Sequence, residues 1–310
     1  MTRVVFMGTP EFATPILRAL RDHVEVVGVV TQPDRPAGRG QGARESAVKR
    51  AAVEAGLPVI QPKTLRAPEA CVQLERWSPD VIVVAAFGQI LRQNVLDLPP
   101  HGCINVHASL LPRWRGAAPI QAAIRAGDPV SGVTIMRMDA GLDTGPILAQ
   151  RTIPLDPRET FRTLHDKLAA LGAALLVETL PRYLSGAVAP QPQPDDPALV
   201  TLAPSIKKEE GEIDWTRPAV EIDRLVRAFD PWPGTFTTWA GRTLKVIAGR
   251  PVDGSAEPGR VVETGMGVAV GAGAGLFALE RLQLEGRKAL DIADFVRGQP
   301  GLIGSVLGAR

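Results

Sequence analysis

Three polar residues have the types and the spacing needed for acyl-transfer chemistry without a covalent nucleophile. Asn105 and His107 stand two positions apart in a short apolar stretch, and residues i and i+2 of a strand project from the same face. Asp143 follows in a glycine-punctuated loop after the apolar run 132–138. When an amine attacks a carbonyl, the Asn and His N–H groups can both donate to the oxyanion. A neighbouring Asp would fix the His tautomer and help to carry the excess proton away.

Each of these residues also has a plain structural explanation. Asn105 and His107 could satisfy a strand end and Asp143 could be a turn residue, because short patterns are weak signals. The three together favour a site. Cys103 is a candidate thiol nucleophile two positions before Asn105, but its place on the approach to the strand favours packing. Cys71 completes neither a disulfide framework nor a metal-ligand spacing, and nothing in the sequence requires a metal.

The elements that must position these residues follow an α/β pattern. Apolar runs at residues 3–7, 24–31 and 80–87 are typical of buried parallel strands, and strands alternate with helices up to about residue 150. We therefore predict a doubly wound, Rossmann-like domain. The turn at residues 8–10 lacks the second and third glycines of the dinucleotide fingerprint, which argues against the alternative of a nucleotide-cofactor oxidoreductase.

Composition is that of a globular protein with room for one large or two ordinary domains. The chain has 310 residues, of which 45% are hydrophobic and 22% charged, with a net charge of +2. No apolar run has the length of a membrane span, and the first residues lead into a strand rather than a signal peptide. We expect a cytoplasmic monomer with no membrane partner.

The second half of the chain has a different character. Five prolines between residues 187 and 204 predict an extended, semi-rigid segment. We therefore predict domains at residues 1–189 and 207–310, joined by a linker at 190–206. Short strands separated by Gly, Pro and Asp turns predict a small antiparallel β-barrel in the second domain. These strands are expected at 235–240, 242–248, 259–263, 267–270 and 275–284.

Longer motifs add a family resemblance. The stretch NVHASLLP at residues 105–112, continued by RWRGAAPI at 113–120, resembles the signature of the formyltransferases that use 10-formyltetrahydrofolate. The resemblance covers nearly the full length of the chain. It is carried by further motifs at residues 5–12, 31–40, 132–136, 141–145 and 230–236.

This resemblance implies an activity and a set of site residues. It implies transfer of a formyl group from 10-formyltetrahydrofolate to the α-amino group of initiator methionyl-tRNA. In that reaction Asn105 and His107 hold the developing oxyanion, while Asp143 supports His107 and takes part in proton removal. The segments implied to contact the folate contain Phe87, Gly88, Gln89, Ile90, Ser109, Leu110, Leu111, Pro112, Asp139, Ala140 and Gly141.

Two regions are candidates for contact with the tRNA. Residues 32–44 form a loop rich in Gly, Pro and Arg, and residues 31–50 hold five basic against two acidic side chains. Most such loops are only solvated surface, but in the family this insertion wedges into the acceptor end of the tRNA. Arg39 matches its central arginine, with Arg35 and Arg44 on either side.

The resemblance also implies a tRNA-contacting role and an oligonucleotide-binding (OB-like) fold for the second domain. Residues 207–310 hold 14 basic and 14 acidic residues, so their net charge does not indicate RNA binding. A one-sided basic face is a hypothesis. Its candidate members are Lys207, Lys208, Arg242, Lys245, Arg250, Arg281, Arg287 and Lys288.

Two further alternatives stay open from the sequence. One is another folate enzyme with the same three residues, such as a glycinamide ribonucleotide formyltransferase or a formyltetrahydrofolate hydrolase. The basic loop around Arg39 and the barrel after the linker argue against it. The other is a non-catalytic RNA-binding protein, which would tolerate substitution of Asn105 or Asp143 without loss of turnover.

Overall fold

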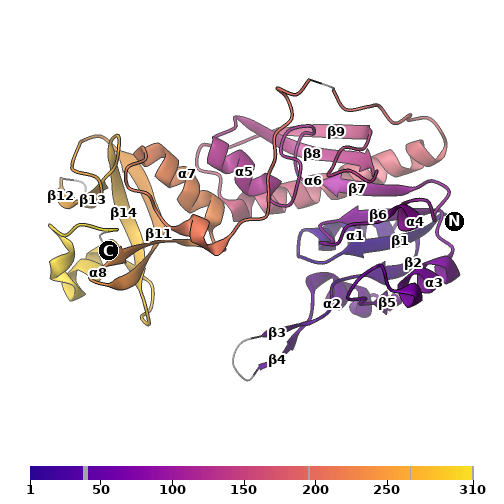
Figure 1. Cartoon of the computed structure of the whole chain (residues 1–310), viewed down its shortest axis with the longest axis horizontal. Helices are drawn as coiled ribbons and strands as arrows, with labels where there is room; N and C mark the ends of the chain where they lie inside the picture. Colours follow the sequence, from indigo (N-terminus) through magenta and orange to yellow (C-terminus); the bar gives the residue numbers. More distant parts are fainter. Residues whose placement is uncertain (38–40, 195, 266, 309–310) are drawn as a thin grey trace. The chain divides into compact units, whose positions relative to one another are not determined.

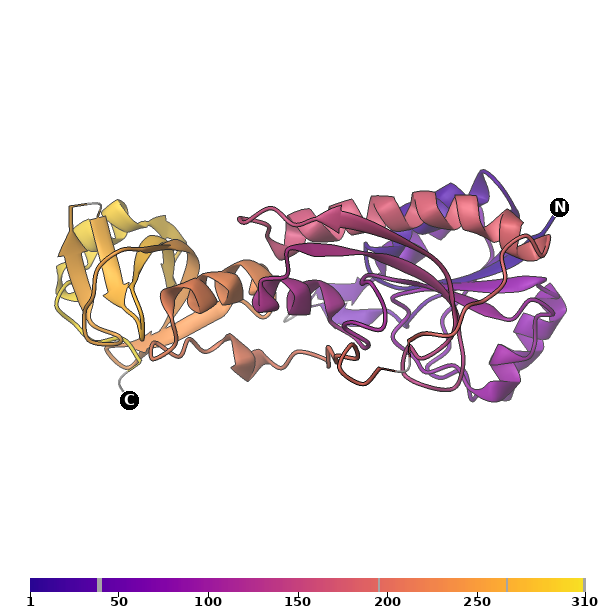
Figure 2. The same ribbon diagram turned by 90° about the horizontal axis from the view of Figure 1, so that it is seen from above.

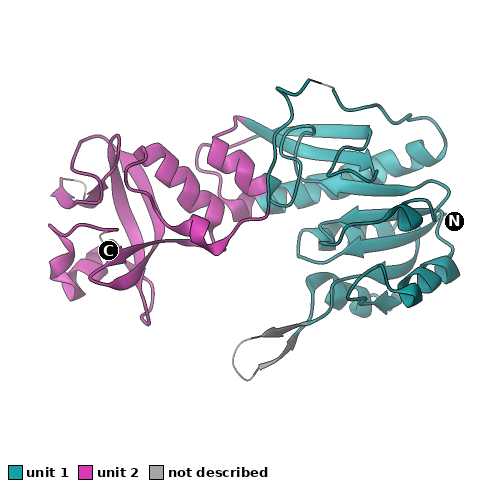
Figure 3. Ribbon diagram, viewed as in Figure 1, with its two compact units in different colours: residues 1–119, 130–154, 165–204 teal, residues 120–129, 155–164, 205–310 magenta. Residues whose placement is uncertain are grey.

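The chain folds into two compact units, one of which carries all three candidate catalytic residues. The computed structural model describes residues 1–37, 41–194, 196–265 and 267–308. Unit 1 comprises residues 1–119, 130–154 and 165–204, and unit 2 comprises residues 120–129, 155–164 and 205–310 (Figure 3). Arg39 lies outside the described residues. The boundaries that we predict at 189/190 and 206/207 stay predictions.

Unit 1 is built on a mixed seven-stranded sheet in the order β5-β2-β1-β6-β7-β8-β9 (Figure 1). The first five strands in this order run parallel, whereas β8 and β9 run antiparallel. The strands are β1 (Arg3–Gly8), β2 (Glu25–Val30), β5 (Val59–Ile60), β6 (Val81–Ala85), β7 (Cys103–His107), β8 (Val130–Arg137) and β9 (Ile147–Pro154).

The predicted α/β class is confirmed, but the sheet is not doubly wound throughout. The chain returns from β7 to β8 antiparallel, and β9 then pairs with β8. Most residues of β9 alternate between greater and lesser exposure, as expected of an edge strand with one face toward solvent. This weak pattern explains why the sequence analysis did not predict β9.

Helices cover both faces of the unit 1 sheet. On one face α6 runs across β7 and β8 (Figure 2), and Gly172 comes so close that an added Cβ would lie 2.8 Å from Cγ1 of Val106. On the other face a core cluster joins β1, β6 and β7 to α3 and α4. The helices are α1 (Ala13–Arg21), α2 (Ala47–Glu54), α3 (Pro68–Trp77), α4 (Gln93–Leu96), α5 (Pro119–Ala126) and α6 (Phe161–Leu184).

The basic loop after β2 contains a short hairpin. Strands β3 (Arg35–Ala37) and β4 (Gln41–Arg44) pair antiparallel, with Arg35 opposite Arg44. An ion-pair network lies at the hairpin base, where Nζ of Lys49 is 2.5 Å from Oδ2 of Asp34 and 2.9 Å from Oε1 of Glu45. Lys49 therefore ties the chain entering the hairpin to the chain leaving it.

Unit 2 contains a six-stranded antiparallel sheet in the order β10-β11-β14-β13-β12, with β15 paired to β14. The antiparallel β domain that we predict is confirmed, with every expected strand present; β15 and α8 were not predicted. The core cluster includes Trp215, Leu244 and Phe277. The elements are η1 (Lys208–Gly211), α7 (Ala219–Phe229), β10 (Thr235–Trp239), β11 (Arg242–Val252), β12 (Val261–Thr264), β13 (Gly267–Gly271), β14 (Leu276–Leu284), β15 (Leu290–Asp291), α8 (Ile292–Gly298) and η2 (Pro300–Leu302).

The helices show no membrane-spanning segment. Among the described residues, none combines the length and the apolar character that crossing a bilayer requires.

Candidate active site

Strand β7 presents Asn105 and His107 at its carboxyl end. Ile104 and Val106 point into the core on the opposite face and are almost completely buried. Asn105 and His107 are also buried, with exposures of 8% and 6%. The alternation predicted from the sequence therefore holds, and it delivers an amide and an imidazole to the same side of the sheet.

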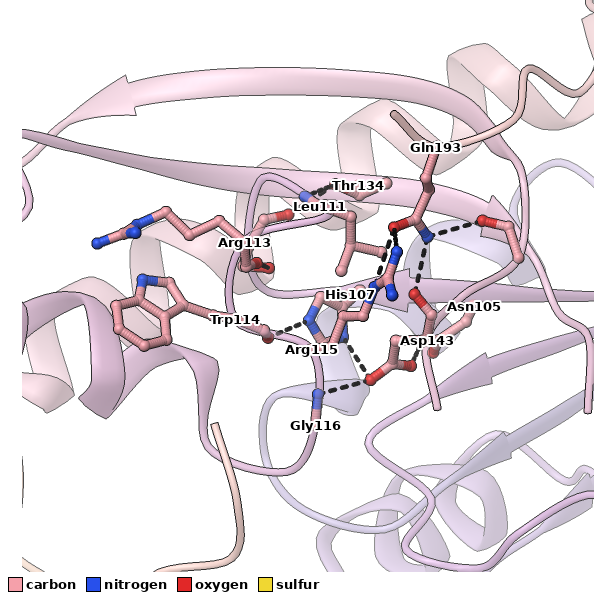
Figure 4. Close-up of polar contacts among 12 residues, drawn as sticks. Asn105, His107, Leu111, Arg113, Trp114, Arg115, Gly116, Thr134, Asp143 and Gln193 are labelled. Carbon is pink, nitrogen blue, oxygen red and sulfur yellow. Dashed lines mark hydrogen bonds and ion pairs between the residues drawn. The ribbon is translucent and has the colours of Figure 1, made fainter. Parts of the chain in front are cut away.

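Asp143 lies beside both residues although it is 36 or more positions away along the chain (Figure 4). Its Oδ1 is 3.5 Å from Nδ2 of Asn105, and its Oδ2 is 3.7 Å from Nδ1 of His107. Both separations are long for hydrogen bonds, as catalytic contacts often are before a substrate binds. The structure therefore brings the three predicted residues together around one carboxylate.

The other nitrogen of His107 fixes the ring tautomer. Nε2 lies 3.0 Å from the backbone carbonyl oxygen of Trp114, which can only accept a hydrogen bond. Nε2 therefore carries a hydrogen, and Nδ1 can donate only when the ring is protonated. Trp114 rather than Asp143 sets the tautomer, which corrects the role that the sequence analysis gave to the carboxylate.

Asp143 itself is held in an uncommon conformation. Its φ of +51° lies in the left-handed region, which non-glycine residues rarely adopt. Its Oδ2 accepts a 2.8 Å hydrogen bond from the amide of Gly116. Earlier in the same loop, Oδ1 of Asp139 accepts from the amide of Gly141 and from Oγ1 of Thr144.

The loop after β7 is tied to the neighbouring strands. Oγ of Ser109 donates to the carbonyl of Arg113 over 2.6 Å, and Oγ1 of Thr134 donates to the carbonyl of Ser109 over 2.7 Å. The amide of Leu111 donates to the same Thr134 oxygen. Gln150 of β9 donates to the Leu111 carbonyl over 2.9 Å. These bonds place Trp114 and its carbonyl against His107.

Comparison with known proteins agrees with this arrangement. The formyl transferase family model matches residues 2–180, and the model of the formyl transferase C-terminal domain matches residues 205–300. The chain belongs to the formyl transferase family.

Curated relatives match across almost the whole chain. The methionyl-tRNA formyltransferase of Myxococcus xanthus is 51% identical over 297 residues, covering 96% of this chain and 95% of the relative. That of Pseudomonas entomophila is 51% identical over 310 residues, covering 99% of each. Among solved structures, an N-formyltransferase from Helicobacter canadensis, in complex with folinic acid and dTDP-3-aminofucose, superposes with a TM-score of 0.66. It is 18% identical and covers 90% of this chain and 99% of its own length, a likeness that shows the fold alone.

The segment expected at the pterin, residues 87–90, follows β6 next to the end of β1. The Phe87 carbonyl accepts from Oγ1 of Thr9 over 2.9 Å and from Nε2 of Gln32 over 3.2 Å. The Gln89 side chain is used in bonds to Leu65 and to the carbonyl of residue 62. Gly88 has φ +82°. Ile90 is 87% exposed, which is unusual for an isoleucine beside a core. Contacts of these residues to a folate stay predictions.

Cys103 has no place in the chemistry. Its side chain packs in the core and its Sγ lies 3.6 Å from the carbonyl of Val95. Burial raises the pKa of the Cys103 thiol to about 12, so the thiolate is not available near neutral pH. The packing role favoured by the sequence is confirmed.

Sequence reasoning missed Gln193, in the proline-rich segment. The side chain is only 7% exposed, and its Nε2 donates to the carbonyls of Asp143 and Gly145 over 2.7 and 2.8 Å. Its Oε1 accepts from Arg115 (Figure 4). A glutamine between prolines gives no local sign of such a role, because its partners are about 50 and 80 positions away.

The residues expected to contact tRNA are spread over both units. Arg35 and Arg44 lie on the β3–β4 hairpin of unit 1. In unit 2, four of the candidate basic residues are exposed along β11 and after β14. These are Arg242, Lys245, Arg287 and Lys288. Contact of any of them with RNA stays a prediction.

Proposed function

We propose that this chain is a methionyl-tRNA formyltransferase, which transfers the formyl group of 10-formyltetrahydrofolate to the α-amino group of initiator methionyl-tRNA. One observation carries the proposal: the identity of about half of all residues with methionyl-tRNA formyltransferases extends over both domains. An enzyme of translation initiation acts where tRNA is charged, so we place it in the cytoplasm.

In this proposal Asn105 and His107 stabilise the negative charge that develops on the formyl oxygen. The Asn105 amide and Nδ1 of His107 both face the Asp143 carboxylate, so they converge on a shared region. Since Nε2 is bonded to the Trp114 carbonyl, Nδ1 donates as part of an imidazolium. Two donors aimed at one oxygen are the usual means of stabilising an acyl-transfer transition state.

Asp143 serves as the proton acceptor in this proposal. The attacking α-amino nitrogen forms a bond to the formyl carbon and must lose a proton, while the folate nitrogen that leaves must gain one. The Asp143 carboxylate accepts hydrogen bonds, stands beside His107 and is partly open to solvent, with 16% of its side chain exposed. It can therefore take up the proton and balance the charge of the imidazolium. The folate supplies the activated formyl group.

The predicted folate segments have features that fit an apolar ring. Ile90 and Leu142 expose 87% and 61% of their surfaces in the two loops expected at the pterin. The Gln89 and Asp139 side chains are used in bonds within their own surroundings. Recognition through backbone groups, as predicted from the resemblance, is therefore the mode that we propose for these loops.

The acceptor is tested by supplying purified protein with 10-formyltetrahydrofolate and different amines. We expect formylation of methionyl-tRNA, and no comparable transfer to glycinamide ribonucleotide or to free methionine. Release of formate without an amine acceptor would instead indicate a hydrolase. Donor consumption with glycinamide ribonucleotide, at a rate above that with methionyl-tRNA, would overturn the proposal. A mass measurement in solution tests the predicted monomer.

A further inference from the structure

We propose that Gln193 is a positioning residue, which holds the backbone of Asp143 in the conformation that faces His107. The inference rests on the proposed function, because it assigns Gln193 to the same reaction. It makes the proline-rich segment a working part of the catalytic unit and not only a connection between domains.

The Gln193 side chain uses its full hydrogen-bonding capacity inside unit 1. Its two amide hydrogens go to the carbonyls of Asp143 and Gly145, over 2.7 and 2.8 Å. Its oxygen accepts two bonds from the Arg115 guanidinium, over 3.1 Å from Nε and 2.6 Å from Nη2. A buried amide with both donors and its acceptor satisfied has one strongly preferred orientation.

Arg115 connects this amide to the other side of the site. The residues on either side of it supply two groups of the catalytic cluster: the Trp114 carbonyl faces His107 and the Gly116 amide donates to Asp143. Gln193 thus links the backbone of the Asp143 loop to the loop that orients His107. Asp143 is held at its carboxylate by one loop and at its carbonyl by the proline-rich segment.

The same segment runs along the loop for several more residues. Arg115 donates its amide to the Thr201 carbonyl over 2.9 Å, and Ala203 donates its amide to the Arg115 carbonyl over 2.7 Å. Gly116 approaches so closely that an added Cβ would lie 2.6 Å from the Ala203 carbonyl oxygen. This pairing fixes the direction of the chain on which Gln193 stands.

The conformation of Asp143 explains why such support is required. A φ of +51° is sparsely populated for a non-glycine residue and persists only where the surroundings determine it. Without the bonds to its carbonyl and to that of Gly145, the loop can relax to a commoner conformation. A shift of about 1 Å at a catalytic group can lower the rate by about 100-fold.

The test compares two glutamines of the segment. Gln193→Met keeps the length of the side chain but removes both donors, whereas Gln191→Met changes an exposed side chain that bonds only to the Ala189 carbonyl. We expect Gln193→Met to lower kcat by about 30- to 100-fold with KM for methionyl-tRNA within about twofold. Gln191→Met should retain kcat within about twofold. An unchanged kcat in Gln193→Met would overturn the proposal.

A double-mutant cycle separates positioning from a general loss of folding. If Gln193 acts through Asp143, Gln193→Met should lower kcat much less in an Asp143→Asn background than in the wild type. An equal fold-loss in both backgrounds would refute a role through Asp143. Gln193→Glu adds a second check, because it keeps the Arg115 contact but removes the donors, and it should be as inactive as Gln193→Met.

Amide hydrogen exchange tests the inference independently of turnover. In Gln193→Met, the peptide covering residues 139–146 should exchange faster than in Gln191→Met, while peptides of the β6 and β7 region stay unchanged. Equal exchange of that peptide in the two variants would contradict the positioning role. If the wild-type chain transfers no formyl group to methionyl-tRNA, the proposed function fails, and the exchange measurement still decides whether Gln193 holds this loop.

Discussion

Replacing Asp143 by Asn is the sharpest perturbation of the proposed mechanism, because it removes a charge and hardly changes the shape. The amide oxygen of the substituted side chain can still accept from the Gly116 amide, as Oδ2 of Asp143 does over 2.8 Å. The negative charge 3.7 Å from Nδ1 of His107 is lost. Two unit charges at 3.7 Å attract each other by about 4.5 kcal/mol at an effective dielectric constant of about 20.

That energy sets the size of the expected loss in rate. A change of about 1.4 kcal/mol is tenfold in rate, so about 4.5 kcal/mol corresponds to about a thousandfold lower kcat. We expect this loss in single-turnover formylation of methionyl-tRNA, with the midpoint of thermal unfolding close to that of the wild type. Loss of the proton acceptor acts in the same direction.

The control for this variant is Asp196→Asn. Asp196 is an exposed carboxylate of the proline-rich segment, and its Oδ1 accepts from the amide of Ala198 over 2.9 Å. An asparagine can accept the same bond, so kcat should stay within about twofold of the wild type. A loss of less than tenfold in folded Asp143→Asn protein would refute the proposed pairing of Asp143 with a protonated His107.

Three further outcomes follow from the described contacts. Cys103→Ala should keep kcat within about threefold and cost about 1 kcal/mol of stability in a denaturant titration, because the thiol packs and does not react. The hydrogen bond from Lys49 lowers the pKa of Asp34, and the bonds to Asp34 and Glu45 raise the pKa of Lys49. A lowered carboxyl pKa stabilises the fold above the unfolded pKa, and a raised ammonium pKa stabilises it below the unfolded pKa. The difference in Tm between wild type and Asp34→Asn should therefore be full between about pH 4 and pH 10 and narrow as pH falls below or rises above this range. Substituting Ala for Arg35 and Arg44 should raise KM for methionyl-tRNA and reduce the salt dependence of binding by about one unit of slope for each phosphate that the hairpin no longer binds; an unchanged slope would count against the hairpin as an RNA-binding element.

Local pattern was enough to predict the element that carries the site. Ile104 and Val106 alternate with Asn105 and His107, and a period of two residues has one structural meaning in an apolar stretch. The buried runs of β1, β2 and β6 were predicted for the same reason. The approach of Asp143 to this strand depends on the tertiary fold, and the sequence supplied it only through the resemblance to a family.

Contacts that cross the fold could not be predicted from local pattern. Pro190, Pro192 and Pro194 indicate only that their segment is neither helix nor central strand. Nothing in them tells that Gln193 turns inward while Gln191 stays exposed. The antiparallel course of β8 and β9 was missed for a similar reason, since strand direction depends on where the connecting chain packs.

The geometry around His107 determines how the three residues divide the work. A neutral ring with its hydrogen on Nε2 would turn the Nδ1 lone pair toward the Asp143 carboxylate, so two acceptors would face each other. The pair is therefore favourable when one proton lies on either His107 or Asp143. With the proton on His107, Nδ1 can donate to an oxyanion beside the Asn105 amide. With the proton on Asp143, the carboxyl has already received what the attacking amine must lose. The position of one shared proton thus distinguishes the state that stabilises the developing charge from the state that follows proton transfer.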